Sequence, residues 1–192
     1  MNKDISVFSQ YATEYDTWFD THAEIYTAQL VLLRPIIPKA GEALEVGVGS
    51  GRFASPLGIG HGLDPTTALL VMARERGVEP VRGVGEFLPY RAGTFDRVLM
   101  MTVICYLEDI GRSFREALRV LRQNGIIIIA FLEKDGVIAL REQSREPKGR
   151  FLRHAALQTA DEVKLALEGA GFSEVGMVHN RQGFYIVTGR KA

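Results

Sequence analysis

The feature that most constrains the fold is an alternation of short apolar segments with helical ones. Strands are expected at residues 43–46, 60–63, 78–82, 95–101 and 126–131, and helices from about residue 52, at 66–76 and at 111–121. The run from Ile126 to Phe131 is apolar and mostly β-branched, as in a central strand that is covered on both faces. Strands that alternate with helices predict an α/β fold built on a mostly parallel sheet.

The two ends of the chain add helices and a hairpin to this core. Residues 1–33 are expected to form a helix that ends before Pro35 and Pro38. Residues 133–158 are expected to form a helix and a loop, and residues 159–168 a helix that begins with a capping box of Thr159 and Glu162. Residues 172–178 and 184–189 are expected to pair as an antiparallel hairpin, joined by residues 179–183.

Length and composition predict one globular domain that spans residues 1–192. Lys plus Arg and Asp plus Glu both total 23, so the net charge gives no reason to expect nucleic acid as a partner. The one cysteine, Cys105, excludes an intramolecular disulfide and a cysteine-based zinc site. No His, Asp or Glu cluster has metal-ligand spacing, so we expect no metal.

The N-terminus lacks the apolar core of a signal peptide. The longest purely apolar run, Ile126 to Leu132, is much shorter than the about 20 residues that a membrane-spanning helix needs. We therefore expect a cytoplasmic chain without membrane insertion.

The most informative local pattern is LEVGVGSGR, from Leu44 to Arg52. Glycine at every second position lets the backbone turn tightly and lets a ligand lie against the main chain. The helix expected after this turn offers free N–H groups to an anionic part of a ligand. Asp64 comes at the end of the next strand, 17 positions after Gly47, where a carboxylate can bond both hydroxyls of a ribose. Two classes of nucleoside-containing cofactor use such an arrangement.

A dinucleotide-binding fold favours G-x-G-x-x-G, but the position of the third glycine holds Arg52. With Glu45 in front, the segment is E-x-G-x-G-x-G, which resembles the first motif of class I S-adenosylmethionine (SAM)-dependent methyltransferases. Three later segments are similar to motifs of the ubiquinone/menaquinone-biosynthesis group of that family, which acts on small molecules: GVGEFLPY (83–90), TFDRV (94–98) and LRVLRQNG (118–125). The resemblance covers roughly residues 42–190, and the N-terminal YxxxYDxWF stretch adds to it.

This resemblance implies a doubly wound, Rossmann-like methyltransferase fold. About seven strands are expected in a mostly parallel sheet, in the order 3-2-1-4-5-7-6, with the last strand antiparallel. The resemblance also implies an enzyme that transfers a methyl group from SAM to a small molecule and releases S-adenosylhomocysteine.

The same resemblance implies a set of cofactor-binding residues. Asp64 is expected to bond the ribose, Glu45 to orient the turn or the methionine ammonium, and Phe87 to flank the adenine with its neighbours. The full set is Glu45, Gly47, Gly49, Gly51, Asp64, Pro65, Thr66, Gly85, Glu86, Phe87, Met101 and Thr102. Met101 and Thr102 are expected to border the methyl end.

Two positions depart from the family pattern. Val84 stands where the family often has an acid that bonds the adenine amino group, so apolar contacts are expected there. Cys105 and Tyr106 stand where members often carry a His pair. No catalytic residue is assigned, because methyl transfer needs a general base only when the acceptor must lose a proton.

Candidates for substrate contact come from three other places. Tyr11, Tyr15 and Trp18 share one face of the N-terminal helix, with Phe19 and His22, and residues 1–34 are expected to form a lid on a core of residues 35–192. Tyr106 follows the fourth strand. A cationic rim within residues 141–154 would recruit an acidic substrate, and the residues chosen from it are Arg150, Arg153 and His154.

Two other functions stay open at this point. One is an NAD-linked oxidoreductase, against which Arg52 in the third glycine position weighs. The other is a non-catalytic SAM-binding or adaptor protein. The sequence does not specify whether the acceptor atom is O, N, C or S, nor the oligomeric state.

Overall fold

A single sheet organises the chain. The computed structural model describes residues 6–38, 40–144 and 149–192, and its seven strands lie in the order β3-β2-β1-β4-β5-β7-β6. β3, β2, β1, β4 and β5 pair in parallel, whereas β7 runs antiparallel between β5 and β6. The predicted fold class and strand order are confirmed. The strands are β1 (Ala43–Val46), β2 (His61–Asp64), β3 (Glu79–Arg82), β4 (Phe95–Met101), β5 (Leu121–Leu132), β6 (Ser173–Arg181) and β7 (Phe184–Arg190).

Helices connect these strands and begin the chain. None of them, within the ranges just given, is long and apolar enough to cross a membrane. The capping box predicted at Thr159 is confirmed at the start of α8, where Glu162 completes it. The helices are α1 (Ser6–Gln10), α2 (Ala12–Thr21), α3 (Ala23–Leu33), α4 (Ala54–Leu57), α5 (Thr67–Glu75), η1 (Ile104–Tyr106), α6 (Ile110–Val120), α7 (Val137–Gln143), η2 (Leu152–His154) and α8 (Ala160–Ala170).

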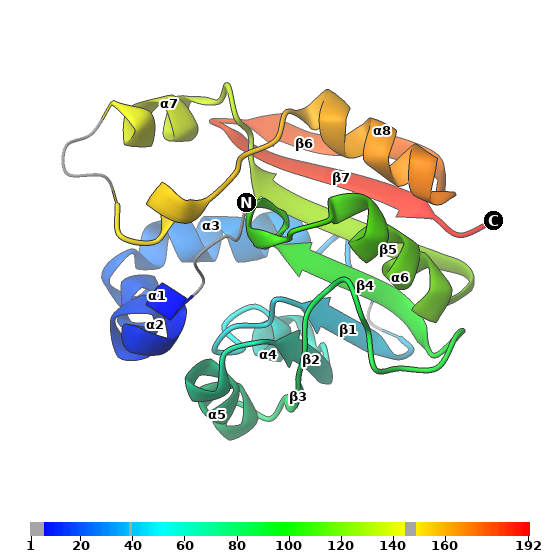
Figure 1. Ribbon diagram of the computed structural model, residues 1–192, viewed down its shortest axis with the longest axis horizontal. Helices are drawn as coiled ribbons and strands as arrows, with labels where there is room; N and C mark the ends of the chain where they lie inside the picture. The colour runs from blue at the N-terminus through cyan, green and yellow to red at the C-terminus, as the bar shows by residue number, and fades with distance from the viewer. Residues whose placement is uncertain (1–5, 39, 145–148) are drawn as a thin grey trace.

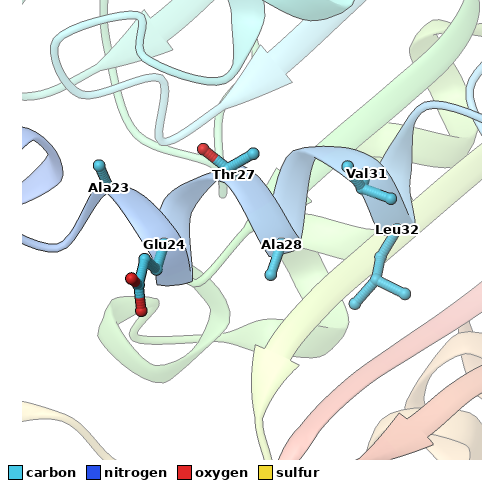
Figure 2. Close-up of a pocket in the computed structure, with 6 residues that line it drawn as sticks. All are labelled: Ala23, Glu24, Thr27, Ala28, Val31 and Leu32. Atoms are coloured by element: carbon cyan, nitrogen blue, oxygen red, sulfur yellow. The ribbon is translucent and has the colours of Figure 1, made fainter.

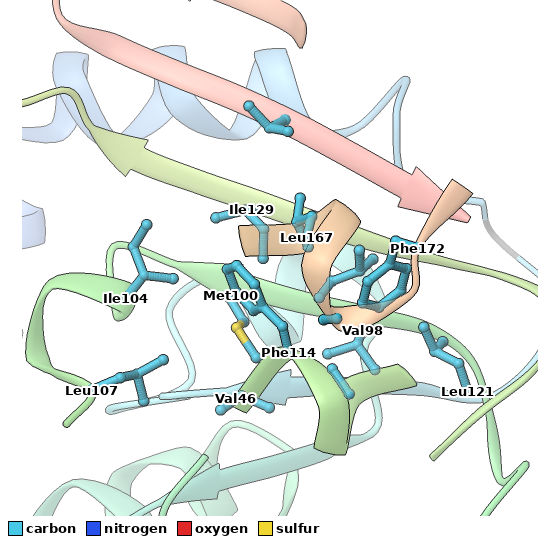
Figure 3. Close-up of a cluster of buried hydrophobic side chains, with 14 of the residues drawn as sticks. Val46, Val98, Met100, Ile104, Leu107, Phe114, Leu121, Ile129, Leu167 and Phe172 are labelled. Atoms are coloured by element: carbon cyan, nitrogen blue, oxygen red, sulfur yellow. The ribbon is translucent and has the colours of Figure 1, made fainter. Parts of the chain in front are cut away.

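Both faces of the sheet are covered, and alternate residues of the central strands point into the two layers. On one face, Val98 and Met100 of β4 pack with α6 and α8, and Figure 3 shows Phe114 of α6 within this cluster. On the other face, Leu99 and Met101 pack with α3, α4 and α5. Full burial of one such side chain stabilises the fold by about 1.5–3 kcal/mol. This burial on both sides explains the nearly continuous apolar run of β5.

The carboxyl ends of the parallel strands meet at one edge of the sheet. Figure 1 shows the arrowheads of β4 and β5 pointing to the side of the molecule where α1, α2 and α7 lie. The loops that follow β1, β2 and β4 open on this same edge, because these strands are parallel neighbours. Open α/β sheets bind ligands at such an edge, so the predicted site residues are brought to one region.

The N-terminal segment forms three helices, so the single helix predicted for residues 1–33 was wrong. At the second break, the Thr21 hydroxyl donates to the carbonyl of Trp18 at 3.0 Å. His22 then leaves the helical region, with φ −120° and ψ 42°. A hydroxyl that bonds the preceding turn offers the backbone an alternative to continuing the helix. Residues 1–5 of the predicted helix lie outside the described residues.

The predicted length of the last connection was wrong. The connection predicted at residues 179–183 is a turn of only Gln182 and Gly183, with φ of 53° and 78°. Two successive residues at positive φ fit the tight turn that matches strand twist, so the hairpin stays paired up to the turn. The helix expected from about residue 52 is the short α4, which begins at Ala54.

Candidate functional site

The glycine turn, residues 47–51, is tied to the end of β2 by main-chain hydrogen bonds. The N–H groups of Gly47 and Val48 both donate to the Leu63 carbonyl, at 2.7 and 3.0 Å. Gly47, Gly49 and Gly51 have φ of 74°, 52° and 80°, which side chains other than glycine rarely adopt. The backbone conformation of the turn is therefore enough to explain why it contains three glycines.

Asp64, the last residue of β2, lies buried beside this turn. Its Oδ2 accepts a hydrogen bond from the Gly49 N–H at 3.0 Å, and its Oδ1 accepts one from the Thr66 N–H at 2.8 Å. Burial raises the pKa of Asp64, and these two N–H groups oppose that shift. The Thr66 side chain also hydrogen-bonds this carboxylate and opposes the shift. A carboxylate has about four lone-pair sites, so Asp64 can still accept a further bond from a hydroxyl group. Pro65 and Thr66 then lead into α5, and the Thr66 side chain makes no capping bond.

Glu45 lies in β1 on the other side of the turn and is 1% exposed. The Ala54 N–H bonds its carboxylate, but burial dominates and raises the pKa of Glu45 well above its ordinary value. Its Oε2 has no hydrogen-bond partner in the described part of the chain. A buried oxygen without a donor costs free energy, so this atom marks a place where a ligand's donor would bind.

The loop after β3 holds the residues predicted to flank an adenine. Gly85 is buried, and Glu86 turns its carboxylate to the start of α6, where Oε1 accepts from the Glu108 N–H at 2.8 Å. Phe87 is 60% exposed and lies under the Arg112 guanidinium, 3.7 Å from its ring centroid. The loop therefore presents an apolar ring, while the Glu86 carboxylate braces a neighbouring loop.

The segment after β4 closes the site from the opposite side. Met101 is buried at the strand end, and Thr102 has φ of 50°, which is rare for a β-branched residue. The Thr102 N–H donates to the Ala130 carbonyl at 2.7 Å. Val103 packs directly on the glycine turn, since a Cβ added to Gly47 would lie 2.3 Å from it. Strained residues gather at functional sites, and this one lies where the methyl end is predicted.

Four rings from four segments form an aromatic cluster at this edge: Phe8, Tyr15, Tyr106 and Phe151. Phe8 lies 5.5 Å from Tyr15, 5.1 Å from Tyr106 and 5.2 Å from Phe151 between ring centroids, and Tyr15 lies 5.6 Å from Phe151. Burial raises the pKa of Tyr106, and neighbouring Cys105 and Tyr15 raise it further. The structure thus brings two predicted substrate residues, Tyr15 and Tyr106, into one neutral and largely apolar cluster.

Three other predicted substrate residues lie elsewhere. Trp18 stacks on His22 with 4.5 Å between ring centroids and takes no part in the aromatic cluster. Arg150 pairs with Glu14 at 3.1 Å, and its guanidinium covers the Tyr11 ring at 3.8 Å from the centroid. Tyr11 and Arg150 therefore fasten α2 to the segment before η2.

Arg153 and His154 lie together in η2, where the Arg153 Nε donates to the His154 Nε2 at 2.8 Å. Arg153 also lines a hollow of about 320 Å³ with Lys134, which follows β5. Leu132, Leu152 and Leu157 contribute apolar walls to this hollow. Ala156, which also lines the hollow, connects it to the segment after β4, because the Ala156 N–H donates to the Cys105 carbonyl of η1 at 2.9 Å.

A larger hollow, of about 670 Å³, lies on α3 alone (Figure 2). Its lining includes Ala28, Val31 and Leu32, and no residue of the glycine turn or of the loops after β2 and β4. Of the residues that line it, Glu24 is the one with a titratable side chain. We therefore place the candidate site at the strand ends and not in this hollow.

The ion pairs that join α2 to the glycine turn could not be predicted from the sequence. Asp16 receives hydrogen bonds from Arg52 and Arg76, partners 36 and 60 positions away. Phe8 and Phe151 of the aromatic cluster were not predicted either. An acid within an aromatic stripe, and an arginine directly after a glycine turn, were the only local signals. Over the ranges that the structure describes, no group of three His, Cys, Asp or Glu side chains could hold a metal ion.

Comparisons with known proteins agree on one family. The profile of a methyltransferase domain matches residues 44–129. A protein of Methanocaldococcus jannaschii, uncharacterised, is 36% identical over 171 residues, which are 89% of this chain and 83% of that protein. The malonyl-[acyl-carrier protein] O-methyltransferase of Geobacter sulfurreducens is 29% identical over 88% of this chain and 70% of its own length. A crystal structure of a SAM-dependent methyltransferase from Thermotoga maritima, described as a "possible histamine N-methyltransferase", has a TM-score of 0.90 and 29% identity, and covers 97% of this chain and 99% of that one.

Proposed function

The chain belongs to the class I SAM-dependent methyltransferases, and we propose that it methylates an acidic small molecule. The family makes it an enzyme that uses SAM and a small-molecule acceptor. The comparisons do not favour an NAD-linked oxidoreductase or a non-catalytic adaptor. The proposal concerns which residues hold SAM and which chemical class the acceptor belongs to.

The observation that carries the cofactor proposal is a pair of buried carboxylates, Glu45 and Asp64, on the two strands beside the glycine turn. The unpartnered Oε2 of Glu45 suits an ammonium donor, and the remaining acceptor capacity of the Asp64 carboxylate suits a ribose hydroxyl. SAM carries both kinds of donor, so the residues present fit it. The missing Cβ atoms of Gly47, Gly49 and Gly51 let Val103, Tyr15 and Ala73 pack against the turn.

The remaining cofactor residues take roles by position. Phe87 and Gly85 flank the adenine, while Pro65 and Thr66 lie beside the adenosine. Met101 and Thr102 border the methyl end. SAM, when bound, supplies a methyl group already activated by a sulfonium, so this chain's residues mainly align acceptor and methyl.

The hollow lined by Lys134 and Arg153 supports an acidic acceptor. Lys134 and Arg153 outnumber the Glu142 carboxylate that also lines this hollow, so its charged groups sum to a positive charge that suits a carboxylate on an apolar body. When a carboxylate oxygen takes the methyl, its negative charge and the sulfonium's positive charge are both lost, and no proton must leave. This explains why the site needs no general base. The names of relatives do not select the acceptor atom, since an O-methyltransferase and a possible N-methyltransferase are both 29% identical to this chain, so the proposal of oxygen rests on the charge of the hollow.

Asp64→Ala tests the cofactor part of the proposal. SAM affinity should fall by about tenfold or more, because the ribose hydroxyls lose a charged acceptor. Asp161→Ala removes an exposed aspartate of α8 and should leave the affinity unchanged. Equal affinity in Asp64→Ala and the wild type would remove Asp64 from the site.

The acceptor class is tested by transfer of a radiolabelled methyl group from SAM to a panel of small carboxylates and small amines. We expect product only from carboxylates. Lys134→Gln with Arg153→Gln should raise the KM for the accepted acid, whereas Arg141→Gln, a nearby cation outside the hollow, should not. Methylation of amines alone would contradict the proposed acceptor class.

A further inference from the structure

Helix α2 is fastened to the glycine turn through one carboxylate. The Arg52 Nε and Nη2 donate to the two oxygens of Asp16 at 2.9 and 2.8 Å. Arg76 donates through Nη2 to Asp16 Oδ2 and through Nη1 to the Ser50 carbonyl, both at 2.8 Å. Arg52 follows the turn directly and Ser50 lies within it. Asp16 is therefore held to the turn from two directions.

Of the two aspartates that Arg52 contacts, Asp16 is the one that anchors the helix. The Asp16 side chain is 16% exposed and accepts from two arginines, whereas Asp20 is 64% exposed and accepts from Arg52 alone. Both aspartates receive two hydrogen bonds from Arg52, so exposure and the second arginine distinguish them, and exposed ion pairs contribute little to stability. Burial would raise the pKa of Asp16, but hydrogen bonds from Arg52 and Arg76 outweigh burial and hold it below its ordinary value.

This anchor determines where the preceding residue lies. Tyr15 is adjacent to Asp16 and places its hydroxyl against the turn, since a Cβ added to Gly49 would lie 3.2 Å from that oxygen. Burial raises the pKa of Tyr15, and the nearby carboxylates of Asp64 and Glu45 raise it further. The hydroxyl therefore stays protonated and can donate a hydrogen bond. It lies beside the two carboxylates assigned to the cofactor.

We propose that Asp16 is a positioning residue that, by binding Arg52 and Arg76, holds the Tyr15 hydroxyl over the glycine turn as a wall and donor of the SAM pocket. This inference rests on the proposed cofactor site. It assigns a function to the predicted N-terminal lid: α2 completes the pocket. Tyr15 itself contacts the glycine turn, whereas Asp16 acts through Tyr15.

Binding of S-adenosylhomocysteine, measured by calorimetry, tests this without any acceptor. Tyr15→Phe should weaken binding by about three- to tenfold, the effect of one neutral hydrogen bond. Asp16→Asn should weaken it at least as much. If Asp16 acts through Tyr15, the double variant should bind no more weakly than Asp16→Asn alone. Two independent losses that multiply would contradict the inference.

The only tryptophan, Trp18, lies on α2 and reports its position. Asp16→Asn should make Trp18 more accessible to acrylamide quenching, and Tyr15→Phe should not. Glu174→Gln breaks a surface pair with Arg190 at 3.2 Å and serves as the matched control, with affinity and quenching both unchanged. A purely structural role for Asp16 would change quenching without changing affinity, which would overturn the inference.

A second variant covers the case in which Asp16→Asn fails to fold. Arg52→Lys keeps the charge but loses the two-pronged contact, so its affinity should fall partway. Wild-type affinity in folded Arg52→Lys would then overturn the inference. If the wild-type chain itself fails to bind S-adenosylhomocysteine, the proposed cofactor site is wrong and this inference falls with it. Binding that Asp16→Asn leaves unchanged contradicts the inference alone.

Discussion

Gly47→Ala is expected to destabilise the fold through two separable effects. The residue has φ of 74°, and an alanine in this left-handed region costs about 1–2 kcal/mol. Its Cβ would also lie 2.3 Å from Val103 Cγ2 and 2.6 Å from Val103 Cβ, an overlap whose relief costs about 1–3 kcal/mol. The sum, about 2–5 kcal/mol, is a large share of the about 5–15 kcal/mol that stabilises a typical domain.

Urea unfolding of four variants separates these effects. Gly58→Ala is the matched control, because Gly58 has φ of 68° but no atom within 4 Å of the added Cβ. It should lose only the backbone contribution, about 1–2 kcal/mol. Val103→Gly removes both the Cβ and the Cγ2 that overlap, so Gly47→Ala should cost about 1–3 kcal/mol less in its presence. The reasoning is refuted if Gly47→Ala costs no more than Gly58→Ala, or if Val103→Gly gives no relief.

Two further results are expected from the same fold. Phe114 of α6 is fully buried, so Phe114→Ala should lower the free energy of unfolding, measured in urea, by about 3–5 kcal/mol. A loss under about 1 kcal/mol would contradict its central place in the core. Hydrogen bonds from Arg52 and Arg76 outweigh burial and lower the pKa of Asp16 in the folded state. The charged Asp16 therefore stabilises the fold fully above the ordinary aspartate pKa of about 3.9. This stabilisation is lost as the pH falls toward the lower pKa of the folded state. Acid titration followed by Trp18 emission should therefore show α2 loosening below about pH 4 in the wild type but not in Asp16→Asn; identical titrations would refute this.

The sheet could be predicted from the sequence because local pattern and global fold agree there. Ile126 to Phe131 is apolar on both faces, and the strand is covered on both faces. The glycine turn was recognisable because its spacing meets a backbone need, positive φ at each glycine. Thr159 was recognisable as a cap because the capping box is a local motif. Each of these predictions depended on residues close together in the chain.

The contacts that shape the candidate site depended on residues far apart. In the sequence, Asp16 is one polar position within an aromatic stripe. Its partner Arg76 lies 60 positions later, and only the fold places the two side by side. Phe151 lies in a segment of mixed charge, and only the fold places its ring against Phe8. The rim predicted from charge alone was resolved by geometry, since Arg150 pairs with Glu14 while Arg153 lines a hollow. Periodicity carries no information about such partners.

The most direct test of the account is a calorimetric titration of the wild-type protein with S-adenosylhomocysteine, with NAD titrated in parallel. This reaction product is preferable to SAM because it carries no methyl group to transfer during the titration. The account predicts one-to-one binding of S-adenosylhomocysteine and no binding of NAD. Binding of NAD alone, or of neither compound, would contradict the assignment of the glycine turn, Glu45 and Asp64 to a SAM site.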